Sequence, residues 1–425
     1  MGVTGQSAAT NPAYYSGGTL AGPPGTGAGF TAGSHVVDAS GTYWVWTGSQ
    51  WTNGTLCNQR ALTPLTAGLA NRQFATCNIA VVGDSITVGQ HATVMDNRWV
   101  GRLRTELNTR FPTPNQPAGG RGFIACGSTG ETSYTYPVVQ NGSSPKVNQG
   151  PRGGDGAASG GFQLNGSGQS FVFTLNGDSA SAMWVQVAFG GTFSYQVDSN
   201  AAVNQSTNGS GTVDGKLTHF SLGSAGAHTV TLAWVSGNAS VDGVIEYNGD
   251  FSSGIQVHDC GHYGWQTSSW VTALNSGAAS GPTAAIAALK PNAVIIALGV
   301  NDQFSGTAPA AYAANLQTII TDLKQQLTTP YPSFILFMYP PRTGQSGYTF
   351  PWSAYTQAAW QVAAADTSGP GGTSLVAVMD CTRGPLLPGA DTDVYGIWQA
   401  GDLVHPSNLG HQALGDLMSA FLMAC

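Results

Sequence analysis

The residues best suited to chemistry in this sequence are a serine in its first quarter and an Asp-His pair near its end. Ser85 lies in the segment Gly83-Asp84-Ser85, directly after the apolar run 79–82. Near the other end lies Asp402-Leu403-Val404-His405-Pro406. A carboxylate three residues before a histidine can reach Nδ1 of the imidazole, which leaves Nε2 free to take a serine proton. Taken alone, Gly-Asp-Ser is as typical of a turn or helix cap as of a nucleophile.

Two further segments offer hydrogen-bond donors for a developing negative charge. Gly299-Val300-Asn301-Asp302 follows the apolar run Ala293–Leu298. A carboxamide at that place can stabilise an oxyanion by about 3 kcal/mol, although a turn or helix cap is the better explanation of this segment taken alone. Upstream, Asp259-Cys260-Gly261-His262-Tyr263-Gly264-Trp265 contains glycines whose N–H groups can face a ligand.

The elements that would position these residues alternate between apolar strands and amphipathic helices. We expect strands that end at Gly83 and that cover Ala293–Leu298, Ser333–Tyr339 and Ser374–Asp380, and helices over Trp99–Leu107, 308–327, 353–366 and 408–423. Such alternation predicts a parallel sheet covered by helices on both faces. Ligands of these sheets bind at the carboxyl ends of the strands, where Ser85 and Asn301 are expected.

Residues 150–250 follow a different pattern, with short strands separated by Gly, Asn and Ser turns. The expected strands are Ser170–Leu175, Ala182–Val187, Gly191–Val197, Thr229–Trp234 and Val241–Tyr247. This block predicts an inserted antiparallel β-sandwich that serves carbohydrate binding, cleft building or assembly, or acts only as a spacer.

Before the α/β pattern begins, residues 1–24 predict an extended arm, and His35–Asp38 and Thr42–Trp46 predict a small β unit. The aromatic side chains of this unit suit either its own core or stacking on sugars.

In this order, the four polar segments resemble the four sequence blocks of the SGNH (GDSL-type) hydrolase family. The resemblance covers roughly 78–130 and 252–425 and implies an α/β fold of three layers, like that of flavodoxin. We therefore expect an N-terminal arm and β module at 1–58, a hydrolase domain in two parts at 59–132 and 252–425, and the sandwich at 133–251.

The same resemblance implies the role of each residue in a serine esterase that needs no metal or other cofactor. Ser85 would be the nucleophile, His405 the base and Asp402 the acid that orients it. The N–H groups of Ser85 and Gly264 and the side chain of Asn301 would form the oxyanion hole. Asp259-Cys260 stands where the family often has an asparagine, so Gly261 or Gly127 remains an alternative to Gly264.

Several other residues allow both a functional and a structural interpretation. Tyr263, Trp265 and Asp84 are candidates to line the substrate site, as is Trp352, and the aromatic ones fit the core equally well. His258 and His262 have a helical metal-ligand spacing that Gly261 disfavours, and Asp391-Thr392-Asp393 is only a fragment of a calcium loop.

The composition restricts the partners. Of the 425 residues, 14 are Lys or Arg and 21 are Asp or Glu, so the net charge of −7 gives no basic surface for nucleic acid or anionic membranes. No run reaches the roughly 18 apolar residues of a membrane span, and the first residues do not resemble a secretory signal. The cysteines suggest disulfides between Cys57 and Cys77 and between Cys381 and Cys425.

The segment Ala32–Trp51 resembles a small β unit of tail proteins from phages of actinobacteria. The resulting hypothesis is a virion tail esterase that deacylates an acylated glycan of the host cell envelope. Its expected partners are other tail proteins and further copies of itself, with a trimer favoured. A secreted bacterial carbohydrate esterase or lipase, and a catalytically inert receptor-binding or structural tail protein, remain the alternatives.

Overall fold

The computed structural model describes residues 14–16, 35–37, 43–46, 49–53, 59–113, 120–127, 136–147, 161–274, 281–340, 347–381, 396–402 and 404–424. A five-stranded parallel sheet lies at its centre. Its strands are β5 (Cys77–Gly83), β17 (Ile255–Gly261), β18 (Ala293–Ala297), β19 (Ser333–Met338) and β20 (Val376–Asp380).

The order of these strands across the sheet is β17-β5-β18-β19-β20. Numbered along the chain this is 2-1-3-4-5, the order of flavodoxin-like sheets, whose ligands bind where the winding reverses beside the first strand. Every residue of β18 and β19 is buried, as expected for parallel strands covered on both faces. The predicted α/β fold with a parallel sheet and added antiparallel sheets is confirmed.

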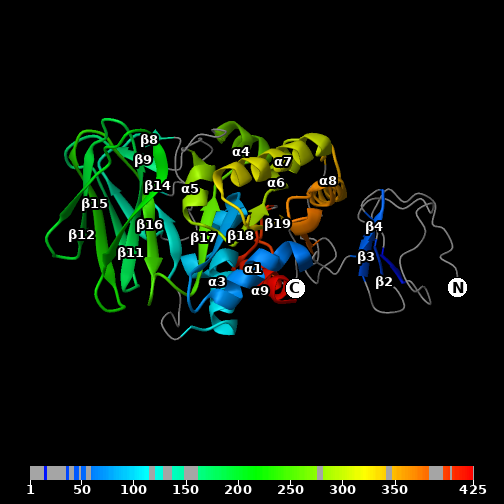
Figure 1. Ribbon diagram of the computed structural model, residues 1–425. Coiled ribbons are helices and arrows are strands. Elements are labelled where there is room, and N and C mark those ends of the chain that lie inside the picture. The colour runs from blue at the N-terminus through cyan, green and yellow to red at the C-terminus, as the bar shows by residue number, and fades with distance from the viewer. Residues whose placement is uncertain are drawn as a thin grey trace.

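Helices cover both faces of this sheet. Figure 1 shows α1 (Thr63–Asn71), α3 (Trp99–Arg110) and α9 (Asn408–Ala424) below the sheet, and α4 (Thr267–Ala273), α5 (Pro282–Ala288), α7 (Pro309–Gln326) and α8 (Trp352–Ala365) above it. In α7 the buried residues Leu316, Ile319 and Ile320 recur three and four positions apart, which places them on one face against the core. The short elements are α2 (Ser85–Val88), α6 (Val300–Phe304), η1 (Gln59–Leu62), η2 (Met95–Asn97) and η3 (Pro370–Gly372).

Two antiparallel sheets form a sandwich beside the parallel sheet (Figure 1). One has the order β13-β12-β15-β10-β7, with strands Val203–Ser206, Thr192–Val197, His228–Ser236, Ser170–Leu175 and Val138–Asn141. The other has the order β14-β11-β16-β9-β8, with strands Val213–Ser221, Ser179–Gln186, Ala239–Tyr247, Gly161–Leu164 and Lys146–Val147, and β6 (Gly122–Ala125) also pairs with β16. The antiparallel pairing therefore begins at Gly122, upstream of residue 133 where the insertion was predicted to start.

The second of these sheets joins the sandwich to the core of the parallel sheet. Trp184 and Val244 point into the core between the two antiparallel sheets, whereas their neighbours Met183 and Ile245 belong to the core of the parallel sheet. Both faces of β11 and β16 are consequently buried. The sequence pattern missed β14, because its polar and glycine residues interrupt the apolar alternation.

The N-terminal residues form a small separate sheet of β1 (Tyr14–Ser16), β2 (His35–Val37), β3 (Tyr43–Trp46) and β4 (Trp51–Asn53) (Figure 1). β1 lies within the predicted arm, and it pairs in parallel with β2. No helix in the described ranges is long and apolar enough to cross a membrane.

The suggested disulfides are not formed. Cys77 and Cys381 carry free, buried thiols. Each is placed in or beside a central strand, and burial raises the pKa of Cys77 to about 12. These thiols act as small core side chains.

Candidate active site

Three neighbouring strands end in register at the edge of the parallel sheet that carries the polar segments. Gly83 at the end of β5 pairs with Gly261 of β17 on one side and with Ala297 of β18 on the other. Neighbouring strands lie about 4.8 Å apart, so the residues that follow them emerge close together. This register brings Ser85 between the glycine-rich segment and Asn301.

The turn that presents Ser85 is held by its neighbours. Asp84 is the N-cap of α2, and its Oδ1 accepts a hydrogen bond of 2.9 Å from the N–H of Ile86. At Gly83 a Cβ atom would lie 1.9 Å from Oγ1 of Thr87, so only glycine permits this close turn. Ser85 is the first residue of α2, where its backbone N–H has no acceptor within the helix.

His405 and Asp402 reach Ser85 from the loop before α9. Nε2 of His405 lies 2.8 Å from Oγ of Ser85, and Nδ1 of His405 lies 2.8 Å from Oδ2 of Asp402. The loop is closed by a bridge between Trp398 and Pro406 and by a hydrogen bond from the N–H of Gln399 to the carbonyl of His405.

The carboxylate of Asp402 is held in its ionised form. Its Oδ1 accepts hydrogen bonds of 2.6 and 2.9 Å from the N–H groups of Val404 and His405. Partial burial alone would raise the pKa of Asp402, but the His405 ring and these N–H groups outweigh it and hold the pKa well below its ordinary value. Asp402 therefore stays charged at any pH at which His405 can act as a base.

A hydrogen bond connects two of the segments that are expected to supply oxyanion donors, those of Asn301 and Gly264. Nδ2 of Asn301 donates a hydrogen bond of 2.9 Å to the carbonyl of Trp265, next to Gly264. Gly264 is exposed and has a φ of +74°, and its N–H donates no hydrogen bond within the part of the chain that the structure describes. Of the two alternatives, Gly261 donates to Oδ1 of Asp259, and Gly127 packs against the ring of Phe162 in the sandwich. Gly264 therefore has the most accessible N–H of the three.

Three of the residues expected to line the site are buried. Asp84 and Trp265 are only 1% and 2% exposed, which favours packing within the fold over direct contact with a substrate. Burial raises the pKa of Asp84 to about 7. Trp352 is buried as well and donates to the carbonyl of Tyr339. Tyr263 is partly exposed, and its lining role stays a prediction.

The helical spacing considered for a metal site at His258 and His262 is not found in the structure. His258 lies within the strand β17, and His262 directly follows the end of this strand. His258 bonds to Asn78 through Nε2, while the ring of His262 stacks 3.7 Å from that of Trp265. Residues 391–393 lie outside the described residues.

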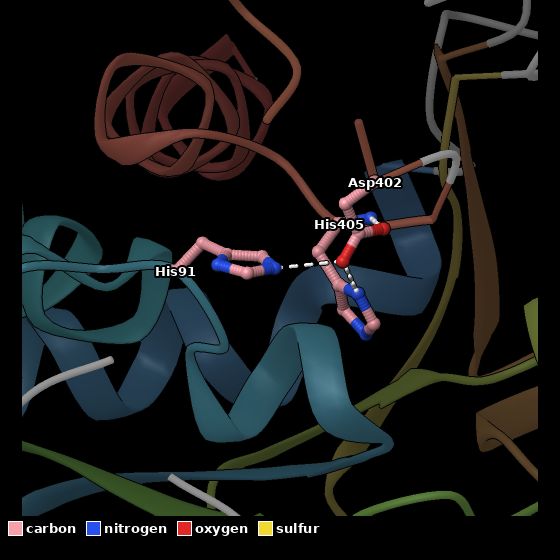
Figure 2. A group of neighbouring side chains, drawn as sticks. All are labelled: His91, Asp402 and His405. Atoms are coloured by element: carbon pink, nitrogen blue, oxygen red, sulfur yellow. Dashed lines mark hydrogen bonds and ion pairs between the residues drawn. The ribbon is translucent and has the colours of Figure 1, made fainter. Parts of the chain in front are cut away.

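One cluster that the sequence did not reveal is His91, Asp402 and His405, whose ligand-type atoms lie within 4.8 Å of one another. A divalent metal held there would occupy Nδ1 of His405. The neutral ring would then carry its proton on Nε2 and could not take the proton of Ser85. The cluster is connected by hydrogen bonds instead, and Figure 2 shows two of them meeting at one oxygen of Asp402.

A buried ion pair was also missed by the sequence prediction. The guanidinium of Arg98 contacts Oδ2 of Asp259, and both side chains are at most 3% exposed. Arg98 also donates to the carbonyls of Met95 and Val88. Because Asp259 accepts the N–H of Gly261, this pair joins the loop after α2 to the glycine-rich segment.

A cavity of about 1100 Å³ lies elsewhere in the fold. Among its lining residues are Asn292, Pro332 and Leu375, which precede β18, β19 and β20. It is therefore at the amino edge of the parallel sheet, opposite to the edge that carries Ser85.

The sequence comparison agrees with this geometry. Residues 236–413 match the GDSL-like Lipase/Acylhydrolase family. The chain carries a GDSL-type hydrolase domain. The matched range includes Asn301, Asp402 and His405, whereas Ser85 lies before the inserted sandwich and reaches them only in the folded chain. With its serine, histidine and aspartate connected in this way, the chain is a serine ester hydrolase.

One solved structure shares the fold of this hydrolase, and others align with it over a smaller part. One described as "Peptidoglycan O-acetylesterase in action, 5 min" aligns with a TM-score of 0.61 at 17% identity, over 87% of this chain and 99% of the other. A family two carbohydrate esterase from Clostridium thermocellum in complex with a cello-oligosaccharide aligns over 68% of this chain and 98% of its own, at 14% identity and a TM-score of 0.29. A two-domain esterase active on acetylated mannans covers 33% of this chain and 40% of its own, at 15% identity and a TM-score of 0.26. Only the first aligns well enough to compare architectures. No curated protein sequence matches the hydrolase.

Proposed function

We propose that the hydrolase removes O-acetyl groups from a bacterial cell-envelope polysaccharide, with Ser85 as nucleophile, His405 as base and Asp402 as the residue that orients the base. The observation that carries this proposal is the hydrogen-bonded chain from Oγ of Ser85 through His405 to Asp402. It ends at the carboxyl edge of the sheet, where open α/β folds bind ligands.

The contacts of the two ring nitrogens of His405 determine how the proton moves in the reaction. Because the carboxylate of Asp402 only accepts hydrogen bonds, Nδ1 of His405 carries a proton and Nε2 has its lone pair directed at Ser85. Nε2 takes the proton as Oγ attacks the ester carbonyl, and His405 returns it to the leaving alcohol. Water then attacks the acyl-enzyme by the same route, and the N–H groups of Ser85 and Gly264 and the amide of Asn301 stabilise both oxyanions.

Two observations support an acetylated glycan as the substrate. A solved structure with a similar architecture is described as a peptidoglycan O-acetylesterase, and the alignment covers 99% of its chain. Close to Asn301, the ring of Phe304 is 71% exposed, which suits the apolar face of a sugar. These features favour a polysaccharide over a long acyl chain.

The first experiment compares the hydrolysis of p-nitrophenyl acetate and p-nitrophenyl palmitate by the wild type and by Ser85→Ala. We expect turnover of the acetate ester only, and loss of about three orders of magnitude or more in the variant. Equal turnover by Ser85→Ala would exclude Ser85 as the nucleophile. Release of acetate from O-acetylated envelope polysaccharide then tests the substrate, and preference for the palmitate ester would favour a lipase.

The location in a phage tail rests on the resemblance of the segment Ala32–Trp51 to tail proteins. Two measurements test it: mass spectrometry of purified virions, and the mass of the purified chain in solution, for which a trimer is expected. Detection in the culture medium of an uninfected bacterium would instead favour a secreted carbohydrate esterase. A chain that binds cells but hydrolyses neither ester would favour the receptor-binding alternative.

A further inference from the structure

One oxygen of Asp402 serves two histidines. Oδ2 of Asp402 lies 2.8 Å from Nδ1 of His405 and 2.7 Å from Nε2 of His91. Figure 2 shows both contacts at this oxygen, with His91 approaching from a different segment than His405. The centroids of the two imidazole rings are 5.7 Å apart. A catalytic serine, histidine and aspartate leave this second histidine unexplained.

We propose that His91 is a positioning residue of the catalytic site, which holds Asp402 by donating its Nε2–H to Oδ2. This inference rests on the proposed roles of Ser85, His405 and Asp402. With His91 in place, the carboxylate accepts two hydrogen bonds at Oδ1 and two at Oδ2. A carboxylate with donors on both oxygens cannot rotate away from His405 without losing several of them.

The backbone around His91 is shaped for this contact. His91 has a φ of +70°, a left-handed conformation that a residue with a Cβ rarely adopts and that costs about 1 kcal/mol. Such conformations persist only where the surrounding structure enforces them, and they concentrate at functional sites. The unusual backbone and the contact with Asp402 occur at the same residue, which is the reason we infer a function and not a chance contact.

Helix α9 supplies the restraint on both sides of His91. The buried ring of His411 bonds through Nε2 to the carbonyl of Gln90 at 2.8 Å. Oδ1 of Asn408 accepts the N–H of Thr93 at 3.3 Å. Burial lowers the pKa of His411 to about 4, so this ring is neutral at ordinary pH and serves as a fixed donor. Since α9 begins three residues after His405, the same helix lies next to both histidines that bind Asp402.

The contact also has an electrostatic effect on His405. A donor at Oδ2 draws part of the negative charge of Asp402 away from the imidazole, which makes His405 easier to deprotonate. The charged or titratable groups near this site include Asp402 and His405, and also His411 and Arg98, which interact electrostatically with each other. Removal of His91 should therefore raise the apparent pKa of His405 and move the acid limb of the rate profile to higher pH.

The experiment measures kcat, KM and the pH dependence of kcat/KM for p-nitrophenyl acetate in His91→Ala and His91→Gln. For His91→Ala we expect kcat to fall about tenfold with KM nearly unchanged, and the acid limb to move to higher pH. The amide of His91→Gln can still donate to Oδ2, so this variant should recover most of the wild-type rate and profile. Thermal unfolding of both variants reports whether they fold.

Two results would overturn the proposal. One is a His91→Ala variant with wild-type kcat and pH profile. The other is an equal loss in both variants with no movement of the profile, which is what a merely structural residue would give. These failures are separate from failure of the proposed function, which would show either as retained activity in Ser85→Ala or as a wild type that hydrolyses neither ester.

Discussion

Oγ of Ser85 and Nε2 of His405 lie 2.8 Å apart although 320 residues separate them in the chain. The inserted sandwich accounts for much of this separation along the chain. The paired strands β17, β5 and β18 end in register and bring the segments that follow them close together. The contact depends on the loop of Asp402 before α9, because Asp402 binds Nδ1 of the His405 imidazole and the N–H of His405. Asp402 is therefore the most informative place to perturb the site without touching either reacting group.

We expect Asp402→Asn to lower kcat for p-nitrophenyl acetate by about 10⁴-fold. An amide cannot accept at both positions, so it presents an N–H to a nitrogen of His405 or to the N–H groups of Val404 and His405. The ring then adopts the tautomer with a proton on Nε2 and cannot receive the proton of Ser85. Steady-state kinetics give the loss directly.

The matched control is the double variant Ser85→Ala/Asp402→Asn. Because both residues belong to one catalytic unit, the second change should add almost nothing to the first. Multiplicative losses in the double variant would show that Asp402 acts outside the path of Ser85.

Asn301→Ala should lower kcat by about 10²–10³-fold with a smaller change in KM. The carboxamide of Asn301 is held against the carbonyl of Trp265, so its direction is fixed before a substrate binds. A donor of this kind stabilises the oxyanion more than the neutral ester, and its loss is expected in kcat. If Asn301→Ala changed only KM, Asn301 would be a substrate-binding residue and not an oxyanion donor.

Whether a strand or helix could be predicted from the sequence depends on the kind of contact that stabilises it. Runs that are apolar throughout, such as Ala293–Leu298, were placed to within a residue, since burial on both faces leaves few alternatives. β17 was missed because Gln256, His258 and Asp259 lie within it, and a strand with such residues does not look buried. The polar side chains of β17 can be buried because residues from elsewhere in the chain bind them, as Arg98 binds Asp259.

The same distinction applies to the site. Recognisable strand ends or a proline stand beside Ser85, Asn301, Asp402 and His405. The sequence alone therefore marked these four residues as candidates. His91 has a left-handed backbone in a loop whose residues Gln90 and Thr93 bond to α9, and no local sequence pattern marks it. Contacts of this kind become visible only when the folded chain brings the segments together.

The buried pair of Arg98 and Asp259 predicts a large loss of stability when one partner is removed. Arg98→Met should lower the free energy of unfolding by about 3–5 kcal/mol, because Asp259 would remain charged, buried and unpaired. Urea denaturation measures this change. The activity of the folded fraction should fall as well, since Arg98 also binds the carbonyls of Val88 and Met95 on either side of the His91 loop.

The control for this prediction is Arg102→Met, at the surface. Arg102 is 38% exposed and pairs with Asp416, which is 51% exposed. Such pairs contribute about 1 kcal/mol or less. Equal losses for Arg98→Met and Arg102→Met would contradict the importance assigned to the buried pair.

A pair of buried acids predicts the pH dependence of stability. Asp214 and Asp242 occupy irregular positions of β14 and β16, the two strands that flank β11. Burial raises the pKa of Asp214 to about 7, and burial together with the nearby Asp214 raises that of Asp242 well above its ordinary value. Neither oxygen of Asp242 has a hydrogen-bond partner among the residues that the structure describes.

Because these pKa values are raised by folding, the folded chain retains protons that the unfolded chain releases near pH 4. The contribution of each such carboxyl to the free energy of unfolding is therefore largest below pH 4. It falls by about 1.4 kcal/mol per pH unit as the pH rises toward 7. Asp214→Asn should therefore flatten the fall in the free energy of unfolding between pH 5 and 7. Urea denaturation at several pH values tests this, and a variant with the wild-type slope would refute it.

Phe304 offers a direct test of the polymeric substrate. Its ring is 71% exposed on α6, three residues after Asn301, so both side chains lie on the same side of that helix. If the ring packs against a sugar, its loss should cost about 1 kcal/mol, which corresponds to about a fivefold higher KM for acetylated polysaccharide. Hydrolysis of p-nitrophenyl acetate, which has no sugar, should be unchanged in Phe304→Ala.

Phe74→Ala is the matched control for this change. Phe74 is 83% exposed, but it precedes β5 and therefore lies at the amino edge of the sheet, away from Ser85. Its variant should hydrolyse both substrates like the wild type. Should Phe304→Ala and Phe74→Ala show the same KM for the polysaccharide, the sugar would have to contact other residues of the carboxyl edge, with partly exposed Tyr263 the first to examine.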